Sequence, residues 1–230
     1  MAPKLDHIVV LLPVSETPEQ LLRHAEPFKK NFTLSPGGFY TDKRTQNILV
    51  SLPDGVYLEL IAFTSKSHNS DHPWAERHPT KIIDFAFLGH PEKGKEAYQE
   101  GIPGGRGECQ WVVTMPKKEW GVGTLPFWCG DITPRERRVP KPETHPSGVT
   151  AVKKITILID SKKQLDRITK MYREIVGSEE LKVGTPSGEE VTIEVRTPAT
   201  KEEEQALADD GEGVYEIEFD AGVVISNSLL

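Results

Sequence analysis

Two residues whose types fit a metal centre lie in segments that pattern as strands of one unit. His7 lies near the start of the apolar run 5–12, and Glu59 lies within the apolar run 56–63. An imidazole and a carboxylate together form half of a common divalent-metal site. The same spacing also fits a hydrogen-bonded histidine near a sheet end and a carboxylate that faces solvent, so both interpretations stay open.

The remaining ligands would have to come from a second unit, and two alignments supply different residues. When residues 5–12 are aligned with 152–159, Lys154 takes the place of His7, and a protonated lysine is a poor ligand. When they are aligned with 82–89, Asp84 takes that place. We therefore predict His7, Glu59 and Asp84 as metal ligands if the middle of the chain is the partner of the first unit.

Cationic and aromatic side chains provide candidate contacts for a small substrate. Arg106, Arg135 and Arg138 could each bind a carboxylate through two parallel hydrogen bonds, although pairing with the acidic surface explains them equally well. Aromatic side chains would form the walls of such a site. The predicted substrate contacts are Tyr40, Asn47, Tyr57, Arg106, Trp111, Trp128 and Arg135, and Glu59 is the candidate catalytic residue, as a ligand or a general base.

Other reactive residue types carry weaker signals. Cys129 lies in an apolar context, which favours a buried, inert thiol. His68, His72 and His78 lie among prolines, at spacings that do not fit a helical metal site. We interpret them as a polar loop over the mouth of a cleft. Nucleophile-elbow, phosphate-loop and dinucleotide motifs are not found in the sequence.

The elements that must position these residues follow a repeated order. Residues 5–12 predict a strand, Thr17–Gln20 a capped helix start, and 46–52 and 56–63 two further strands joined by a Pro-Asp-Gly turn. A similar order returns near the C-terminus. There the strands are predicted at 151–159, at 191–196 and from 213, a helix begins at Ser161, and the acidic residues 198–212 are interpreted as an inserted loop.

The middle of the chain predicts a looser unit, with strands at 81–88, 110–115 and 125–130, a short helix at 93–100 and a proline-rich connection at 133–148. We therefore predict an α+β fold of repeated β-α-β-β-β modules that form curled mixed sheets around a cleft. The predicted modules are residues 1–64, 65–148 and 149–230, packed as one globular unit. A cleft of this kind is a natural site for a small molecule.

Composition narrows the class of protein. The chain has 230 residues and a formal net charge of −7, which disfavours a general nucleic-acid binder. Its apolar runs are too short to span a membrane. Two cysteines cannot build a disulfide scaffold. The N-terminus lacks the features of a signal peptide, so we expect a cytoplasmic protein without nucleic-acid or membrane partners.

Several sequence motifs together resemble one family. They are Leu5–Val10, Pro36–Gly38, Thr45–Asn47, Tyr57–Ile61, Trp111, Pro126-Phe127, Asp131–Arg135 through Pro140, and His145–Gly148. This set is similar to the glyoxalase-like domain family of the vicinal oxygen chelate superfamily, and to its fungal-type members. The resemblance covers about residues 5–160 well and the rest loosely.

The resemblance implies paired modules around a cleft, and a divalent ion that acts as a Lewis acid on a substrate with adjacent oxygens. Zinc, manganese, iron or nickel would fill that role, held by His7 and Glu59. It also makes a homodimer an expectation. Two departures weaken the metal interpretation. Phe39-Tyr40 stands where relatives tend to have a histidine, and Gly130 stands where a histidine is expected before Asp131.

Three functions therefore stay open. The first is a metal-dependent lyase, isomerase or dioxygenase that acts on a small oxygenated metabolite. The second is a metal-free protein that binds and sequesters a small molecule between aromatic walls. The third is a catalytically inactive relative. Activity on a glutathione adduct is disfavoured, because the sequence carries no recognisable glutathione-site motif.

Overall fold

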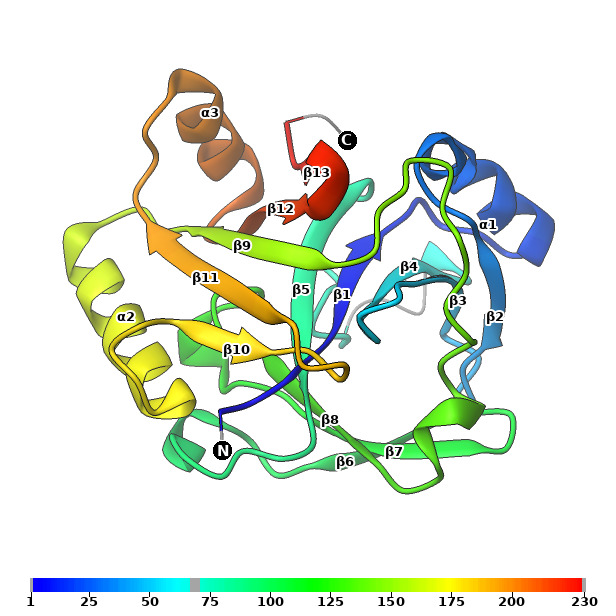
Figure 1. Cartoon of the computed structure of the whole chain (residues 1–230), viewed down its shortest axis with the longest axis horizontal. Coiled ribbons are helices and arrows are strands. Elements are labelled where there is room, and N and C mark those ends of the chain that lie inside the picture. The colour runs from blue at the N-terminus through cyan, green and yellow to red at the C-terminus, as the bar shows by residue number, and fades with distance from the viewer. Residues whose placement is uncertain (1, 67–70, 229–230) are drawn as a thin grey trace.

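The fold is built from two sheets, in a computed structural model that describes residues 2–66 and 71–228 (Figure 1). The first module runs through β1 (Leu5–Leu11), α1 (Pro18–His24), β2 (Ser35–Phe39), β3 (Thr45–Ser51) and β4 (Tyr57–Phe63). The second contributes β5 (Lys81–Leu88), β6 (Ile102–Arg106), β7 (Cys109–Thr114) and β8 (Phe127–Asp131). Together they form an eight-stranded sheet in the order β2-β3-β4-β1-β5-β8-β7-β6.

The two halves of this sheet are related by a local twofold arrangement. β1 pairs in parallel with β4, and β5 pairs in parallel with β8. β1 and β5 join the halves as antiparallel neighbours. The middle unit is therefore the partner of the first module, which was one of the two alternatives left open by the sequence. At the far ends the curled sheet nearly closes, where Thr41 N donates a hydrogen bond to Gly105 O, 3.0 Å away.

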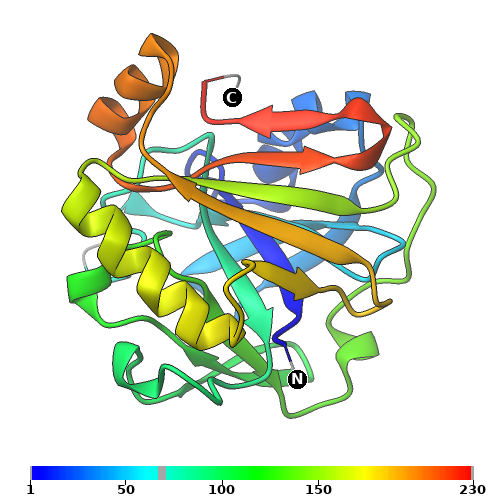
Figure 2. The same cartoon turned by 60° about the vertical axis from the view of Figure 1, so that its left-hand side comes forward.

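The C-terminal unit forms a second sheet. It consists of β9 (Val152–Leu158), α2 (Lys162–Val176), β10 (Lys182–Gly184), β11 (Glu190–Arg196), α3 (Lys201–Asp210), β12 (Gly213–Phe219) and β13 (Val224–Ser226). The five strands lie in the order β10-β11-β9-β12-β13. In Figures 1 and 2 this sheet crosses in front of β1 and β5.

One hydrophobic core lies between the two sheets. It includes Ile8 and Phe85 from the eight-stranded sheet, Ile155 and Ile217 from the five-stranded sheet, and Tyr172 from α2. Tyr172 is fully buried and its hydroxyl donates to Thr124 O, 2.8 Å away. The opposite face of the eight-stranded sheet carries a separate, smaller cluster that lines a cavity.

The α+β prediction with curled mixed sheets is confirmed, and most predicted strands are found within a few residues of their predicted bounds. Thr17 caps α1, and Gln20 completes the predicted capping box. The helix ends at His24, just before Pro27, where a short 3₁₀ turn follows. The helix predicted at 93–100 is only a 3₁₀ turn, Lys95–Ala97.

Two predictions for the C-terminal unit were wrong. The acidic residues 198–212 are not a loop, because Thr200 accepts a hydrogen bond from Glu203 N and starts α3, with three glutamates in its first turn. The strand predicted from residue 213 does not take the place of the strand predicted at 56–63 in the repeated order. β11 is parallel to β9 as β4 is to β1, whereas β12 is antiparallel to β9 and takes the place of β5.

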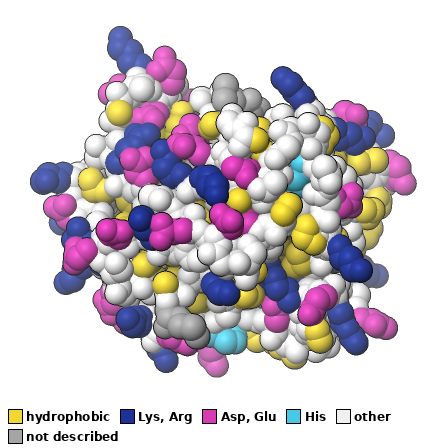
Figure 3. Space-filling view, viewed as in Figure 1, with side chains coloured by type: hydrophobic (Ala, Val, Ile, Leu, Met, Phe, Trp, Pro, Cys, Tyr) yellow, Lys and Arg dark blue, Asp and Glu magenta, His cyan; other side chains and the backbone are white. Residues whose placement is uncertain are grey.

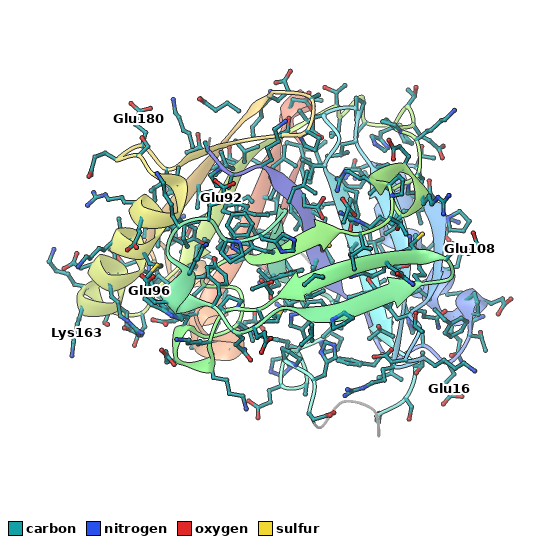
Figure 4. The ribbon with its side chains drawn as sticks, turned by 90° about the horizontal axis from the view of Figure 1, so that it is seen from below. Glu16, Glu92, Glu96, Glu108, Lys163 and Glu180 are labelled. Carbon is teal, nitrogen blue, oxygen red and sulfur yellow. The ribbon has the colours of Figure 1, made fainter. Side chains whose placement is uncertain are left out.

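The outer face of the five-stranded sheet is charged. Lys154 forms ion pairs with Glu218 and with Glu194, the latter at 3.5 Å. Arg196 pairs with Glu194 at 3.4 Å and with Glu203 of α3. Figure 3 shows acidic and basic side chains interleaved over this face. Seen from below, the labelled Glu108 lies at the β6–β7 turn and points outward (Figure 4). Its side chain is exposed.

Candidate functional site

A cavity of about 290 Å³ lies within the curled eight-stranded sheet. His7 of β1 and Glu59 of β4 contribute polar groups to its wall, and both are 3% exposed. The segment that follows β4 contributes His72 and Trp74. The remaining wall includes the apolar and aromatic side chains of Ile61, Trp111, Val113, Met115 and Phe127, together with charged side chains such as Asp71 and Arg106. The cavity therefore combines a small polar patch with apolar walls, as ligand sites commonly do.

The His7 ring is held on three sides. Its Nδ1 lies 2.7 Å from Asp6 Oδ2. One face stacks on Tyr57, with ring centroids 4.7 Å apart, and Phe127 meets it edge-on at 5.2 Å. Burial lowers the pKa of His7 to about 4, so the ring is neutral at pH 7. A carboxylate only accepts hydrogen bonds, so this contact favours a ring proton on Nδ1, which would leave a lone pair on Nε2.

Glu59 faces the other nitrogen of the His7 ring, Nε2. Its Oε1 accepts hydrogen bonds from the Tyr40 hydroxyl and from Asn47 Nδ2, the latter at 2.6 Å. Its Oε2 lies 3.6 Å from His7 Nε2. Burial, and then proximity to Glu59, raise the pKa of Tyr40 well above its ordinary value, so the hydroxyl keeps its proton. With the ring proton on His7 Nδ1, the cavity presents two hydrogen-bond acceptors side by side, to which a donor group of a ligand can bond.

A cluster of opposite charges lies behind the His7 ring. Arg138 is 4% exposed and pairs with Asp6 at 3.1 Å and with Asp131. Its Nη1 donates to the Tyr57 hydroxyl, 2.8 Å away. Arg135 donates to Asp6 and to Gly55 O. The charges in this cluster compensate one another, which removes the penalty of burying any of them alone.

The structure brings only part of the predicted substrate set to the cavity. Tyr40, Tyr57, Arg106 and Trp111 line it. Asn47 is buried behind Glu59, and its Oδ1 accepts from Arg106 Nη1, 2.8 Å away. Arg135 does not line the cavity, because it holds Asp6. Trp128 points to the opposite face of the sheet and packs on Phe87 in the main core.

The predicted third metal ligand is also held elsewhere. In the register of the two halves, His7 pairs with Ala86 while Asp84 pairs with Val9, so Asp84 is the counterpart of His7. Asp84 accepts from Trp74 Nε1 at 3.0 Å and from Phe85 N at 2.9 Å, and it does not line this cavity.

The residue that corresponds to Glu59 in the second half of the sheet has no atom that could bind a metal. Val9 pairs with Glu59 and Ala86 with Phe127, so Phe127 occupies the corresponding position in the second half. Within residues 2–66 and 71–228, three His, Cys, Asp or Glu side chains are nowhere grouped so as to hold a metal ion. Catalytic metal sites commonly use three protein ligands. The metal-ligating side chains that the described residues place at this cavity therefore do not fit a resident divalent ion.

Sequence reasoning did not single out Asp6 and Trp74, which contact His7 and Asp84. Arg138 was named as a possible carboxylate binder, and the carboxylates that it meets are those of Asp6 and Asp131. The position of Asp6 directly before His7 was a usable signal, whereas the partners of Arg138 and Trp74 are set by long-range packing. The prediction that a polar loop covers the cavity mouth holds for His72, which lines the cavity, while His68 lies outside the described residues. His78 is exposed.

Cys129 has the character that its apolar context predicts. Burial raises the pKa of its thiol to about 12, so it stays protonated at neutral pH. Among the described residues, no helix combines the length and the apolar character that a membrane span needs.

Comparisons with known proteins agree with this fold. A search of curated protein sequences finds no significant match. A hypothetical protein from Staphylococcus aureus is similar in structure, with a TM-score of 0.57, 13% identity, and coverage of 85% of this chain and 86% of that chain. A mutant of 4-hydroxymandelate synthase from Streptomyces coelicolor aligns with a TM-score of 0.55 and 14% identity, over 95% of this chain and 71% of its own. Residues 5–176 match the family model for the glyoxalase-like domain, and the chain belongs to that family.

Proposed function

We propose that the cavity binds a small oxygenated molecule through a hydroxyl group, without a resident metal ion. The observation that carries the proposal is the pair of acceptors, His7 Nε2 and Glu59 Oε2, 3.6 Å apart at a mostly apolar cavity. Both residues line the cavity, and a ligand O–H placed between the two atoms would donate to them through one shared, three-centre hydrogen bond. The carbon skeleton of the ligand would pack against Trp111 and Phe127.

Arg106 would favour a ligand with a second oxygen. It lines the cavity and donates to Asn47 Oδ1 and Arg138 O. A guanidinium has five N–H donors, so further donors can meet a ligand carbonyl or carboxylate. A molecule with a hydroxyl at one end and a carbonyl or carboxylate oxygen near it would therefore match both sides of the cavity.

A second candidate function is proton abstraction from the bound molecule. It is favoured by Asp6, which lies against Nδ1 of His7 and would stabilise the ring if Nε2 took a proton. Glu59 lies next to Nε2 and could take or pass on the same proton. In this role His7 and Glu59 would be catalytic residues of a metal-free acid–base reaction.

Matched pairs of probes test the binding proposal. We expect benzyl alcohol to shift the NMR signals of Trp111 and His7, and benzyl methyl ether, which lacks the donor, to do so at least tenfold more weakly. Glu59→Gln should remove the difference between the two, because its amide supplies a donor in place of an acceptor. Glu108→Gln, at an exposed turn, is the matched control and should behave as the wild type.

Two results would count against the proposal. One is equal binding of the alcohol and the ether, which would show that the acceptor pair does not select the ligand. The other is a stoichiometric divalent ion in the purified, untagged protein that is lost in His7→Ala. That result would restore the metal-dependent interpretation.

A further inference from the structure

We propose that Asp6 is a positioning residue that fixes the tautomer of His7, and that Arg135 and Arg138 hold it in that role. The inference rests on the proposed function, because it determines which ring nitrogen a ligand would meet. A neutral imidazole has one donor and one acceptor nitrogen. The hydrogen bond made by one nitrogen therefore sets the role of the other.

The Asp6 carboxylate lies between His7 and two arginines, which are donors only. Its Oδ2 lies 2.7 Å from His7 Nδ1 and 3.1 Å from Arg138 Nη2. Its Oδ1 accepts from Arg135 Nη1 and, at 3.2 Å, from Arg138 Nη2. Asp6 is fully buried, so water does not compete for these oxygens. The two guanidinium groups compensate its charge and leave its Oδ2 as an acceptor for the Nδ1 proton.

Neighbouring aromatic rings hold the His7 imidazole in this orientation. Tyr57 stacks on one face and Phe127 meets the ring edge-on. Arg135 and Arg138 both lie 5.8 Å from the centroid of the Tyr57 ring, so the stacking partner is itself held by the same two arginines. The orientation of the imidazole and the position of Asp6 are therefore set by one group of contacts.

The tautomer of His7 determines whether His7 Nε2 and Glu59 Oε2 are both available to accept a hydrogen bond from a ligand. With the proton on Nδ1, Nε2 and Glu59 Oε2 both await a donor from the cavity. With the proton on Nε2, that N–H would lie beside Glu59 Oε2, and a slight closing of the 3.6 Å gap would let the two groups hydrogen-bond to each other. Asp6 thus keeps the pair available to a ligand.

Asp6→Asn provides a test with a definite sign. The asparagine has a single acceptor oxygen, and Arg135 and Arg138 both need it. The amide NH₂ would then face His7 Nδ1, which must become the acceptor, and the proton would move to Nε2. We expect ¹⁵N NMR of the histidine-labelled protein at pH 7 to show a protonated Nδ1 in the wild type and a protonated Nε2 in Asp6→Asn. Benzyl alcohol should bind at least tenfold more weakly to the variant.

Asp131→Asn is the matched control. It makes the same chemical change, and Asp131 also contacts Arg138, but its carboxylate does not touch His7. We expect it to keep the wild-type tautomer. Because the spectra need no ligand, a protonated Nδ1 in the wild type with no alcohol binding would refute the proposed function and support this inference.

The inference is overturned if the wild type carries its proton on Nε2, or if a folded Asp6→Asn variant still carries it on Nδ1. Should Asp6→Asn fail to fold, the wild-type spectrum decides. A protonated Nε2 there contradicts the inference whatever the variant does, and a protonated Nδ1 supports it.

Discussion

Asp84 gives the sharpest prediction about stability, because its carboxyl group is buried within the sheet. It is 1% exposed, and burial raises its pKa from an ordinary value of 3.8 to about 7, against the hydrogen bonds from Trp74 and Phe85 and the charge of Arg77. A raised carboxyl pKa means that the folded protein holds a proton that the unfolded chain releases. The folded state therefore loses stability as pH rises from about 4 to about 7.

The size of the effect follows from the shift. One pKa unit corresponds to about 1.4 kcal/mol, so a shift of about three units limits the loss to about 4 kcal/mol. About 3 kcal/mol of this falls between pH 4.5 and 7.5. Asp84→Asn cannot ionise, so the variant lacks this loss. It does carry a constant cost of about 1–3 kcal/mol, since its NH₂ faces one of two donors.

Urea unfolding followed by tryptophan fluorescence measures this difference. The free energy of unfolding of Asp84→Asn, relative to the wild type, should rise by up to about 3 kcal/mol between pH 4.5 and 7.5. The exposed Glu108→Gln variant should show no such rise. A difference between Asp84→Asn and the wild type that is independent of pH would refute the reasoning, because it would mean that Asp84 ionises equally easily in both states.

Four further changes have defined outcomes. Trp74→Phe removes the N–H that bonds Asp84 Oδ2, which should lower stability by about 1–3 kcal/mol and move the Asp84 transition to higher pH in the same urea assay. Phe85→Ala empties a fully buried position in the main core and should cost about 3–5 kcal/mol in urea unfolding. Gly123→Ala should lower the melting temperature, because Gly123 has φ +75° and a Cβ there would lie 2.5 Å from Ile83 O, whereas Gly148→Ala, with open space around its Cβ, should cost less. Ser161→Ala removes the cap of α2 and should cost about 1 kcal/mol by thermal unfolding, and an unchanged melting temperature would contradict the capping role.

The sequence predicts local elements well where one strong signal acts alone. The apolar run 5–12 and the Thr17–Gln20 capping box correspond to β1 and the start of α1. Prediction failed where two signals competed. Residues 198–212 look like a solvated acidic loop, but the cap at Thr200 and the pairing of Arg196 with Glu203 make α3 favourable.

The candidate site was predictable only in part, for a physical reason. His7 and Glu59 could be paired because neighbouring strands of one module must meet. The positions of Asp84, Trp128 and Arg135 depend on which face of a strand is buried and on partners far away in the chain, such as Asp6, 129 residues from Arg135. A pattern of residue types along one strand does not contain that information.

The C-terminal sheet repeats the register of the cavity-forming strands and so shows what keeps the cavity open. Thr156 pairs with Glu194 and Glu216 as Val9 pairs with Glu59 and Asp84. Lys154, two residues before Thr156, therefore corresponds to His7, and its 3.5 Å ion pair with Glu194 corresponds to the 3.6 Å approach of His7 to Glu59.

The difference between the two sheets lies in the side chain at the His7 position. A lysine brings its own donors and satisfies the neighbouring carboxylate within the protein. A neutral histidine whose proton is bonded to Asp6 presents only an acceptor, Nε2, at this position. His7 Nε2 and Glu59 Oε2 therefore both remain free to accept a hydrogen bond from a ligand. The same backbone register therefore gives an ion pair within the protein at Lys154 and, at His7, a pair of acceptors that face the cavity.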